Sequence, residues 1–281
     1  MIREVVKVGI AKLGCIGTLP LLEFLLDERA DRKDIDVRVI GSGAKMGKEQ
    51  AKDVARRMLD VKPDLAIVIS PNATLPGPKV AREMIAEAGI PTIVISDKPT
   101  AKIRKELEEK GFGYIIVNAD SMIGARREFL DPVEMALYNA DIIRVLAVTG
   151  ALSVVYKEID RVIESIKIGE RPRLPHVSVG RDAALAAGFE NPYARAKAMA
   201  AYEVAEKVAD VTVLGCFVVR ESEKYVPLVA EDHEMMRTAA LLADEAREAE
   251  KGADSVLREP HASDGTVLRK RRLAEKPVRP G

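Results

Sequence analysis

The chain has two cysteines, no tryptophan and one glutamine among its 281 residues. Cys15 and Cys216 form neither a disulfide framework nor a metal-ligand spacing, which favours a reducing, cytoplasmic setting. Few thermolabile amides among 31% charged residues is a composition found in thermophile proteins. No secretory signal is visible, and no apolar run approaches the roughly 18 residues needed to span a bilayer. We therefore expect a cytoplasmic protein with no membrane partner.

A net charge of one sign is also lacking, since 44 basic and 44 acidic side chains cancel. This balance argues against nucleic acid as a partner, because nucleic-acid binding requires a basic face. One basic stretch, Arg269–Arg272, lies in a C-terminal tail that has no aromatic residue on which a base would stack. We interpret it as a solvated or subunit-docking tail.

What the sequence does contain is a fivefold alternation of apolar, β-branched runs with polar loops and helix-like segments. This pattern predicts a parallel sheet with helices on both faces, a Rossmann-like α/β fold followed by a largely helical part. In such sheets, ligands bind beyond the carboxyl ends of the strands. The predicted strands are Val5–Ala11, Val37–Ile40, Leu65–Ile69, Thr92–Ile95 and Tyr114–Val117.

The pattern becomes mainly helical after the fifth run. We therefore divide the chain into an α/β coenzyme-binding domain, residues 1–125, a mainly helical part, 126–252, packed against it, and an irregular C-terminal arm, 253–281. Within the helical part, Val211–Val219 is expected to form a late strand. In the first domain, Thr18 is expected to be the N-cap of the first helix.

The loop Gly14–Thr18 follows the first strand, where a nucleotide-binding fold carries its phosphate turn. A dinucleotide fingerprint needs G-x-G-x-x-G and an acidic residue at the end of the second strand. This chain has G-x-x-G, and its second strand ends in Ile40-Gly41-Ser42-Gly43, so a standard NAD fold is not predicted. The two glycines either let a ligand approach the backbone or serve tight turns alone.

A second glycine-rich loop, Gly41–Gly47, carries one cation. This residue, Lys45, either meets a phosphate or carboxylate or is a flexible surface lysine. The loop is not a P-loop, because Gly-Lys-Ser/Thr at the required spacing is absent. The three histidines are scattered along the chain and leave Cys15 without a nearby base, so neither nucleophilic catalysis nor a metal site is expected.

The segment after the fifth predicted strand, Asn118–Pro132, combines several charged residues. It holds an acid, Asp120, and two adjacent arginines, Arg126 and Arg127, at the point where the chain enters the helical part. This placement suits a hinge and one wall of a cleft, or a purely structural linker.

Six stretches, spread from the first strand to the C-terminal arm, match a known pattern. They are Val8–Thr18, Val37–Met46, Ile69–Asn72, Met122–Pro132, Asn191–Glu203 and Arg258–His261. Together they resemble the F420-dependent methylenetetrahydromethanopterin dehydrogenase family of methanogenic archaea, nearly end to end.

The resemblance implies reversible hydride transfer between reduced coenzyme F420, a deazaflavin, and methenyl-tetrahydromethanopterin, which becomes methylene-tetrahydromethanopterin, in the one-carbon metabolism of methanogenesis. It also implies no bound flavin, no metal, coenzyme F420 as a dissociable cosubstrate, and a homo-oligomer, specifically a hexamer. Because hydride passes directly between two carbons, the protein mainly has to hold both coenzymes in contact. Two alternatives stay open: an NAD(P)-dependent oxidoreductase on the same sheet, and a non-enzymatic α/β ligand-binding module.

Under this resemblance we expect the loops at the strand ends to bind coenzyme F420, and the segment after the fifth strand to bind the pterin. No catalytic residue is assigned, but a carboxylate, Asp120 or Glu134, is expected to stabilise positive charge on the methenyl carbon. The expected F420-binding residues are Gly14, Cys15, Ile16, Gly17, Thr18, Ser42, Gly43, Lys45, Pro71, Asn72, Asp97 and Lys98. The expected pterin-binding residues are Asp120, Ser121, Met122, Ile123, Gly124, Arg126 and Arg127.

Overall fold

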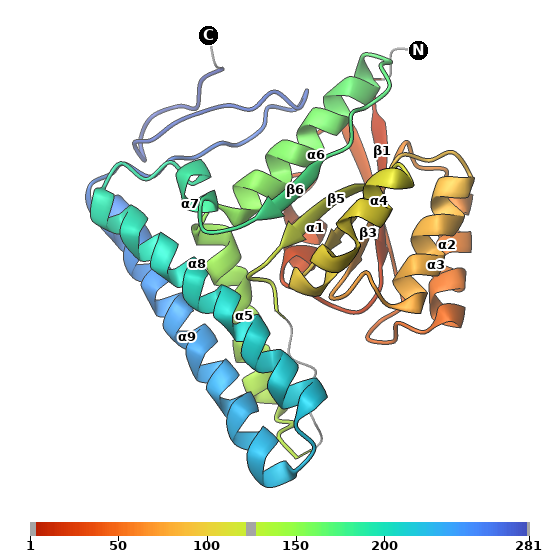
Figure 1. Cartoon of the computed structure of the whole chain (residues 1–281). Helices are drawn as coiled ribbons and strands as arrows, with labels where there is room; N and C mark the ends of the chain where they lie inside the picture. The colour runs from red at the N-terminus through yellow and green to blue at the C-terminus, as the bar shows by residue number, and fades with distance from the viewer. Residues whose placement is uncertain (1–3, 122–127, 280–281) are drawn as a thin grey trace.

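A six-stranded sheet in the order β2-β1-β3-β4-β5-β6 forms the centre of the molecule (Figure 1). The computed structural model describes residues 4–121 and 128–279. Every pair of neighbouring strands is parallel, which confirms the predicted fold class. The strands are β1 Val6–Lys12, β2 Ile35–Gly41, β3 Leu65–Ser70, β4 Thr92–Ser96, β5 Gly113–Val117 and β6 His176–Val179.

Helices connect and cover the strands. The sequence places good start signals before several of them, such as Asp131 and Asn191, whose side chains accept backbone hydrogen bonds at the N-termini of α5 and α8. The helices are α1 Thr18–Leu25, α2 Lys48–Val61, α3 Pro76–Glu87, α4 Arg104–Glu109, α5 Pro132–Val148, α6 Ala151–Lys167, α7 Ala183–Ala186, α8 Pro192–Val213 and α9 Ser222–Gly252, with a 3₁₀ turn, η1 Lys98–Ile103, and a π turn, η2 Leu214–Val218.

Alternating side chains of the strands divide the core between the two faces of the sheet. In β3, Leu65, Ile67 and Ile69 join the larger core beneath α1, α5 and α6. Ala66 and Val68 belong to the other face and pack beneath α2 and α3. Every residue of β3 is buried, as expected for a central parallel strand that is covered on both sides.

The sheet takes its last strand, β6, from beyond residue 125, which the sequence pattern did not predict. This strand has four residues, His-Val-Ser-Val, and too few apolar side chains to stand out as a strand. Helix α6 also packs on the sheet, whereas α8 and α9 pair with each other and extend away from it (Figure 1). The division of the chain at residue 125 stays a prediction, but the sheet itself continues past that point.

The predicted late strand at Val211–Val219 is wrong. Helix α8 continues to Val213, and the π turn η2 follows it. The β-branched residues of this stretch favour a strand, but Gly215 lies against Val229 of α9. Packing of the helix pair therefore decides the conformation here and overrides local propensity.

The C-terminal arm, as far as residue 279, holds isolated antiparallel bridges rather than longer elements. It folds back beside α6 and α7 (Figure 1). The basic stretch within it is paired with acids of the same chain: Arg269 lies 3.0 Å from Glu259, and Arg271 lies 2.9 Å from Glu190. The Arg271 pair joins the arm to the residues before α8, whereas the Arg269 pair lies within the arm.

Candidate functional site

The loops predicted to bind a ligand lie together at the carboxyl-end edge of the sheet. From β1 the chain adds β2 on one side and then returns to add β3 on the other side of β1. The boundary between β1 and β3 is therefore a topological switch point, where ligands bind in such sheets. The Gly14 N–H of the first loop donates to Gly43 O of the second at 3.2 Å, and a Cβ on Gly14 would lie 3.2 Å from Pro71 Cδ of the third. The structure therefore brings the first three predicted loops into contact.

Side chains of the protein pack closely around the first loop, Gly14–Thr18. Gly14 has a φ of +78°, and a Cβ there would lie 2.7 Å from Met46 Sδ. A Cβ on Gly17 would lie 2.3 Å from Ile142 Cγ2 of α5. Of this loop only Cys15 is exposed. Close packing of the protein thus explains both glycines, and ligand approach to the backbone is not needed to explain them.

Asp120 connects the end of β5 to the start of α1. Its Oδ1 accepts the Gly17 N–H at 2.5 Å, and its Oδ2 accepts the Thr18 N–H at 2.8 Å and the Thr18 hydroxyl at 2.5 Å. Thr18 is accordingly the first residue of α1, and the prediction that it is the N-cap is wrong. The side chain of Asp120 is fully buried, so its carboxylate faces α1 rather than an open cleft.

The buried environment of Asp120 determines the pKa, and so the charge, of its carboxyl group. Burial raises the pKa of this carboxyl group to about 6, against the opposing effect of the hydrogen bonds from Thr18 and Gly17. At neutral pH the group is therefore mainly ionised. An ionised carboxylate at a helix N-terminus interacts favourably with the helix dipole and the free N–H groups.

The second loop, Gly41–Gly47, is more exposed to solvent than the first. Ser42 is half-buried, Gly43 and Lys45 are exposed, and nothing lies within 4 Å of a Cβ built on Gly43. Lys45 forms no ion pair with any residue in the described part of the chain. Next to this loop, half-buried Asn72 uses its Oδ1 to accept the Thr74 N–H and hydroxyl, which leaves its amide N–H groups for other partners.

The residues that follow β4 are polar and are more buried than those of the second loop. Asp97 accepts the Lys98 N–H at 2.6 Å, and burial raises its pKa well above the usual range of a carboxyl group. Lys98 itself lies 2.8 Å from Asp210 of α8. The predicted residues Asp97 and Lys98 thus lie at the same edge, where α8 passes the ends of the strands.

A buried polar chain, which sequence reasoning missed, runs from this edge into the helical part. The Ser121 hydroxyl lies 3.1 Å from the Thr212 hydroxyl of α8, and the Thr212 hydroxyl lies 3.2 Å from Asp232 of α9. The Tyr138 hydroxyl donates to Ser121 O at 2.6 Å. Burial raises the pKa of Asp232 to about 7. One acid on a mostly solvated helix carries no sequence signal, because its burial depends on how α8 and α9 pair.

The remaining predicted pterin-side residues divide into two groups. Glu134 is half-exposed and lies 3.5 Å from His233 Nδ1, so the structure does not bring it to Asp120. Its role near the methenyl carbon stays a prediction. Met122, Ile123, Gly124, Arg126 and Arg127 lie outside the described residues.

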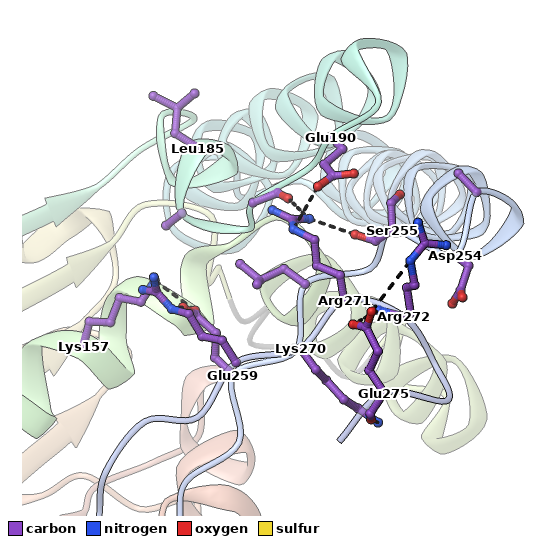
Figure 2. A pocket seen from close by; sticks show the side chains of 15 residues that line it. Lys157, Leu185, Glu190, Asp254, Ser255, Glu259, Lys270, Arg271, Arg272 and Glu275 are labelled. Atoms are coloured by element: carbon purple, nitrogen blue, oxygen red, sulfur yellow. Dashed lines mark hydrogen bonds and ion pairs between the residues drawn. The ribbon is translucent and has the colours of Figure 1, made fainter. Parts of the chain in front are cut away.

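A pocket of about 600 Å³ lies elsewhere, between the C-terminal arm and α6 and α7 (Figure 2). Arg271 points across it toward Glu190, and Arg272 toward Glu275. None of the predicted site residues lines this pocket. Four of its five cations are paired with acids of the same chain, and Lys270 donates to the backbone carbonyls of Leu273 and Glu275, so the carboxyl-end edge remains the candidate site.

Comparison with known proteins gives concordant results. A family model described as methylene-5,6,7,8-tetrahydromethanopterin dehydrogenase matches residues 6–278. The chain is 62% identical over 274 residues to the F420-dependent methylenetetrahydromethanopterin dehydrogenase of Archaeoglobus fulgidus, covering 97% of this chain and 99% of that protein. It is 56% identical over 275 residues to the protein of the same name from Methanocaldococcus jannaschii, with the same coverage.

A solved structure gives the same result in three dimensions. It is described as F420 dependent methylene-tetrahydromethanopterin dehydrogenase in complex with methylene-tetrahydromethanopterin and coenzyme F420. The two structures align with a TM-score of 0.94 at 51% sequence identity, over 97% of this chain and 99% of the other.

Proposed function

This chain belongs to the methylene-5,6,7,8-tetrahydromethanopterin dehydrogenase family, and we propose that it catalyses reversible hydride transfer between methylene-tetrahydromethanopterin and coenzyme F420. The family expected from the sequence is thereby confirmed. The observation that carries the proposal is the near full-length match to a structure that binds both of these molecules. The two alternatives, an NAD(P)-dependent oxidoreductase and a ligand-binding module, have no comparable support.

The open part of the carboxyl-end edge fits coenzyme F420, whose tail is anionic. Lys45 and Lys98 supply cations there, and Asn72 supplies amide N–H groups. When bound, the deazaflavin supplies the carbon that exchanges hydride. The first loop contributes mainly its exposed residue, Cys15, because its other residues are buried beneath protein.

The pterin is proposed to bind where the chain leaves β5. Ser121 is fixed there by hydrogen bonds to α5 and α8. The one-carbon unit loses a hydride and becomes a cationic methenyl group, so nearby negative charge favours the product. Either Asp120, which is ionised behind this edge, or Glu134 is the proposed source of that charge. The remaining task of the protein is to hold the two reacting carbons in contact and exclude water.

The exposed apolar side chains of α5 and the residues before it support a homo-oligomer. Leu130, Val133 and Leu137 are each about 60% exposed, with values of 59%, 66% and 61%. Such a group on one helix face is typical of a subunit interface. We propose a homo-oligomer, a hexamer by family resemblance, located in the cytoplasm. Within the described residues no helix has the length and apolarity required to cross a bilayer.

An anaerobic assay tests the proposal. Purified protein is mixed with methylene-tetrahydromethanopterin and oxidised coenzyme F420, without added metal or NAD(P), and the deazaflavin absorbance is followed. Rapid bleaching is expected, with no absorbance change when NADP⁺ replaces coenzyme F420. Reduction of NADP⁺ instead, or no reaction of a correctly folded protein with either coenzyme, would refute the proposal.

A further inference from the structure

The strand order of this protein places a specific ligand position at the start of α1. In flavin-binding proteins whose sheet has the order 2-1-3-4-5, which this chain shares and extends with β6, flavin mononucleotide binds at the switch point between β1 and β3. A helix N-terminus at this point is suited to the phosphate. In this chain that position already holds a negative charge. We propose that Asp120 is an internal anion, which occupies the phosphate position of the fold and excludes flavin mononucleotide and dinucleotides from it.

The hydrogen bonds support this assignment. A phosphate at a helix N-terminus accepts backbone N–H groups and a nearby hydroxyl, and the Asp120 carboxylate accepts the same kinds of donor from Gly17 and Thr18. The donors come from residues more than 100 positions earlier in the chain. Asp120 therefore does not cap its own helix, and its side chain bridges the carboxyl ends of β5 and β1.

The space around the carboxylate also leaves no room for a second anion. A Cβ on Gly17 would lie 2.9 Å from Asp120 Oδ1, and within 3.1 Å of Leu146 Cδ1 on α5. Side chains of helix α5 thus pack directly against the start of α1 beside the carboxylate. A phosphate-bearing coenzyme has to place its anionic groups elsewhere along the edge, where Lys45 and Lys98 lie.

This inference rests on the geometry of Asp120 and not on the identity of the one-carbon substrate. It gives a physical reason for the expectation that no flavin is bound, although the strand order is one that flavin-binding proteins share. Its failure would leave the hydride-transfer proposal intact, because the assay above does not depend on what fills the start of α1.

Small carboxylates provide the test. Asp120→Ala removes one carboxylate and leaves a space that formate can fill. Formate is expected to raise the melting temperature of Asp120→Ala by ~4 °C or more over chloride at equal ionic strength. The wild-type protein and Asp53→Ala, which lacks an exposed carboxylate on α2, are expected to show no difference between the two salts. Equal melting temperatures of Asp120→Ala in formate and chloride would refute the proposal.

A second variant tests the exclusion of phosphate. Asp120→Ala combined with Ile142→Ala removes both the internal anion and part of the α5 cover, so flavin mononucleotide is expected to bind at least ~10-fold more tightly than to wild type. Binding is measured by flavin fluorescence, and an unchanged affinity in the folded double variant would overturn the exclusion. If Asp120→Ala does not fold in chloride, its refolding yield with and without formate gives the first comparison, and no recovery with formate would count against the proposal.

Discussion

Two clusters of buried charge lie at opposite edges of the sheet and differ in what neutralises them. At the carboxyl-end edge the buried acids, Asp97 and Asp120, contact backbone N–H groups and a hydroxyl. At the amino-end edge, acids and bases alternate in a network that we call the arm anchor, because it holds the C-terminal arm to the sheet. The arm anchor consists of Glu28, Arg32, Asp34, Asp160, Lys167 and His261.

Buried acids at the two edges have pKa values shifted in opposite directions. Burial raises the pKa of Asp97 and Asp120, and the hydrogen bonds they accept do not compensate. Burial also acts to raise the pKa of Asp34, but the hydrogen bond and charge of Arg32 hold it below its usual range. Pairing with a cation, and not depth of burial, thus decides whether the pKa of a buried acid here lies below or above its usual range. The paired charges of the arm anchor are suited to stabilise the fold. The acids at the opposite edge, whose pKa values are raised, are suited to change their charge when a ligand binds.

Removal of Arg32 is expected to have the largest effect, because it would break the arm anchor at its centre. The Arg32 guanidinium lies 2.9 Å from Asp34 and 2.8 Å from Asp160, and its side chain is 1% exposed. Arg32→Met would remove the buried cation that lies between the two carboxylates and lower the free energy of unfolding by about 3–5 kcal/mol in urea denaturation. Arg38→Met, which breaks the exposed pair with Asp36, is the control and should cost under ~1 kcal/mol. Similar losses for both variants would contradict the structural role of the anchor.

The pH dependence of stability distinguishes the two edges next. Asp120 has a pKa raised to about 6 in the folded protein, compared with 3.8 for an ordinary aspartate, which corresponds to about 3 kcal/mol. A raised pKa means that the folded state favours the protonated form. Its contribution to stability is therefore present below pH 4 and lost as the pH rises through about 6. Asp120→Asn should lack this loss, so its stability relative to wild type should improve between pH 4 and pH 7 in urea denaturation. A constant difference across this range would contradict the prediction.

His261 tests the same relation at the arm anchor, over a higher pH range. Burial acts to lower its pKa, but the hydrogen bonds and charge of Asp160 and the hydrogen bond to Glu28 raise it overall. The stabilisation is therefore complete below about pH 6.5 and lost as the pH rises through the raised pKa. His261→Gln should be less stable by about 1.5–3 kcal/mol at pH 6, the usual contribution of charge-assisted hydrogen bonds, and approach wild type at pH 9.

The control for His261→Gln is a double-mutant cycle with Asp160→Asn. Because the Nε2 of His261 lies 2.9 Å from Asp160, the two substitutions should be coupled at pH 6 and nearly additive at pH 9. Additivity at both pH values would show that the histidine is not held by its charge. The arm would then be fixed by packing alone.

Lys98 should show the smallest effect on stability and a clear effect on binding. Its ion pair with Asp210 is partly exposed, so Lys98→Ala should cost under ~1 kcal/mol of folding free energy. If it binds an anionic group of coenzyme F420, the same change should raise the KM for the coenzyme by ~10-fold or more with kcat nearly unchanged. Lys52→Ala, which breaks an exposed pair on α2, is the matched control. An unchanged KM would remove Lys98 from the coenzyme site.

The sequence by itself determined five of the six strands of the sheet and the edge on which the candidate site lies. Runs such as Leu65–Ile69 are apolar along their whole length and rich in β-branched residues, as a strand covered on both faces requires. The alternation with helices made these strands parallel and placed Lys45, Asn72 and Lys98 at one edge. The strand β6 could not be predicted in this way, because its four residues form a strand through their pairing with β5 and not through their own composition.

The tertiary structure alone decided what the charged residues at that edge do. Asp120 was visible as an acid after a strand, but its partner at Thr18 lies 102 positions away and is reached only when β5 and β1 lie in one sheet. The same holds for Asp232, whose burial depends on the pairing of α8 with α9, and for His261, which meets Asp160 only when the arm folds back. Local patterns specify elements because they depend on neighbouring residues, whereas the charge state of a buried group depends on contacts between residues that are distant in the chain.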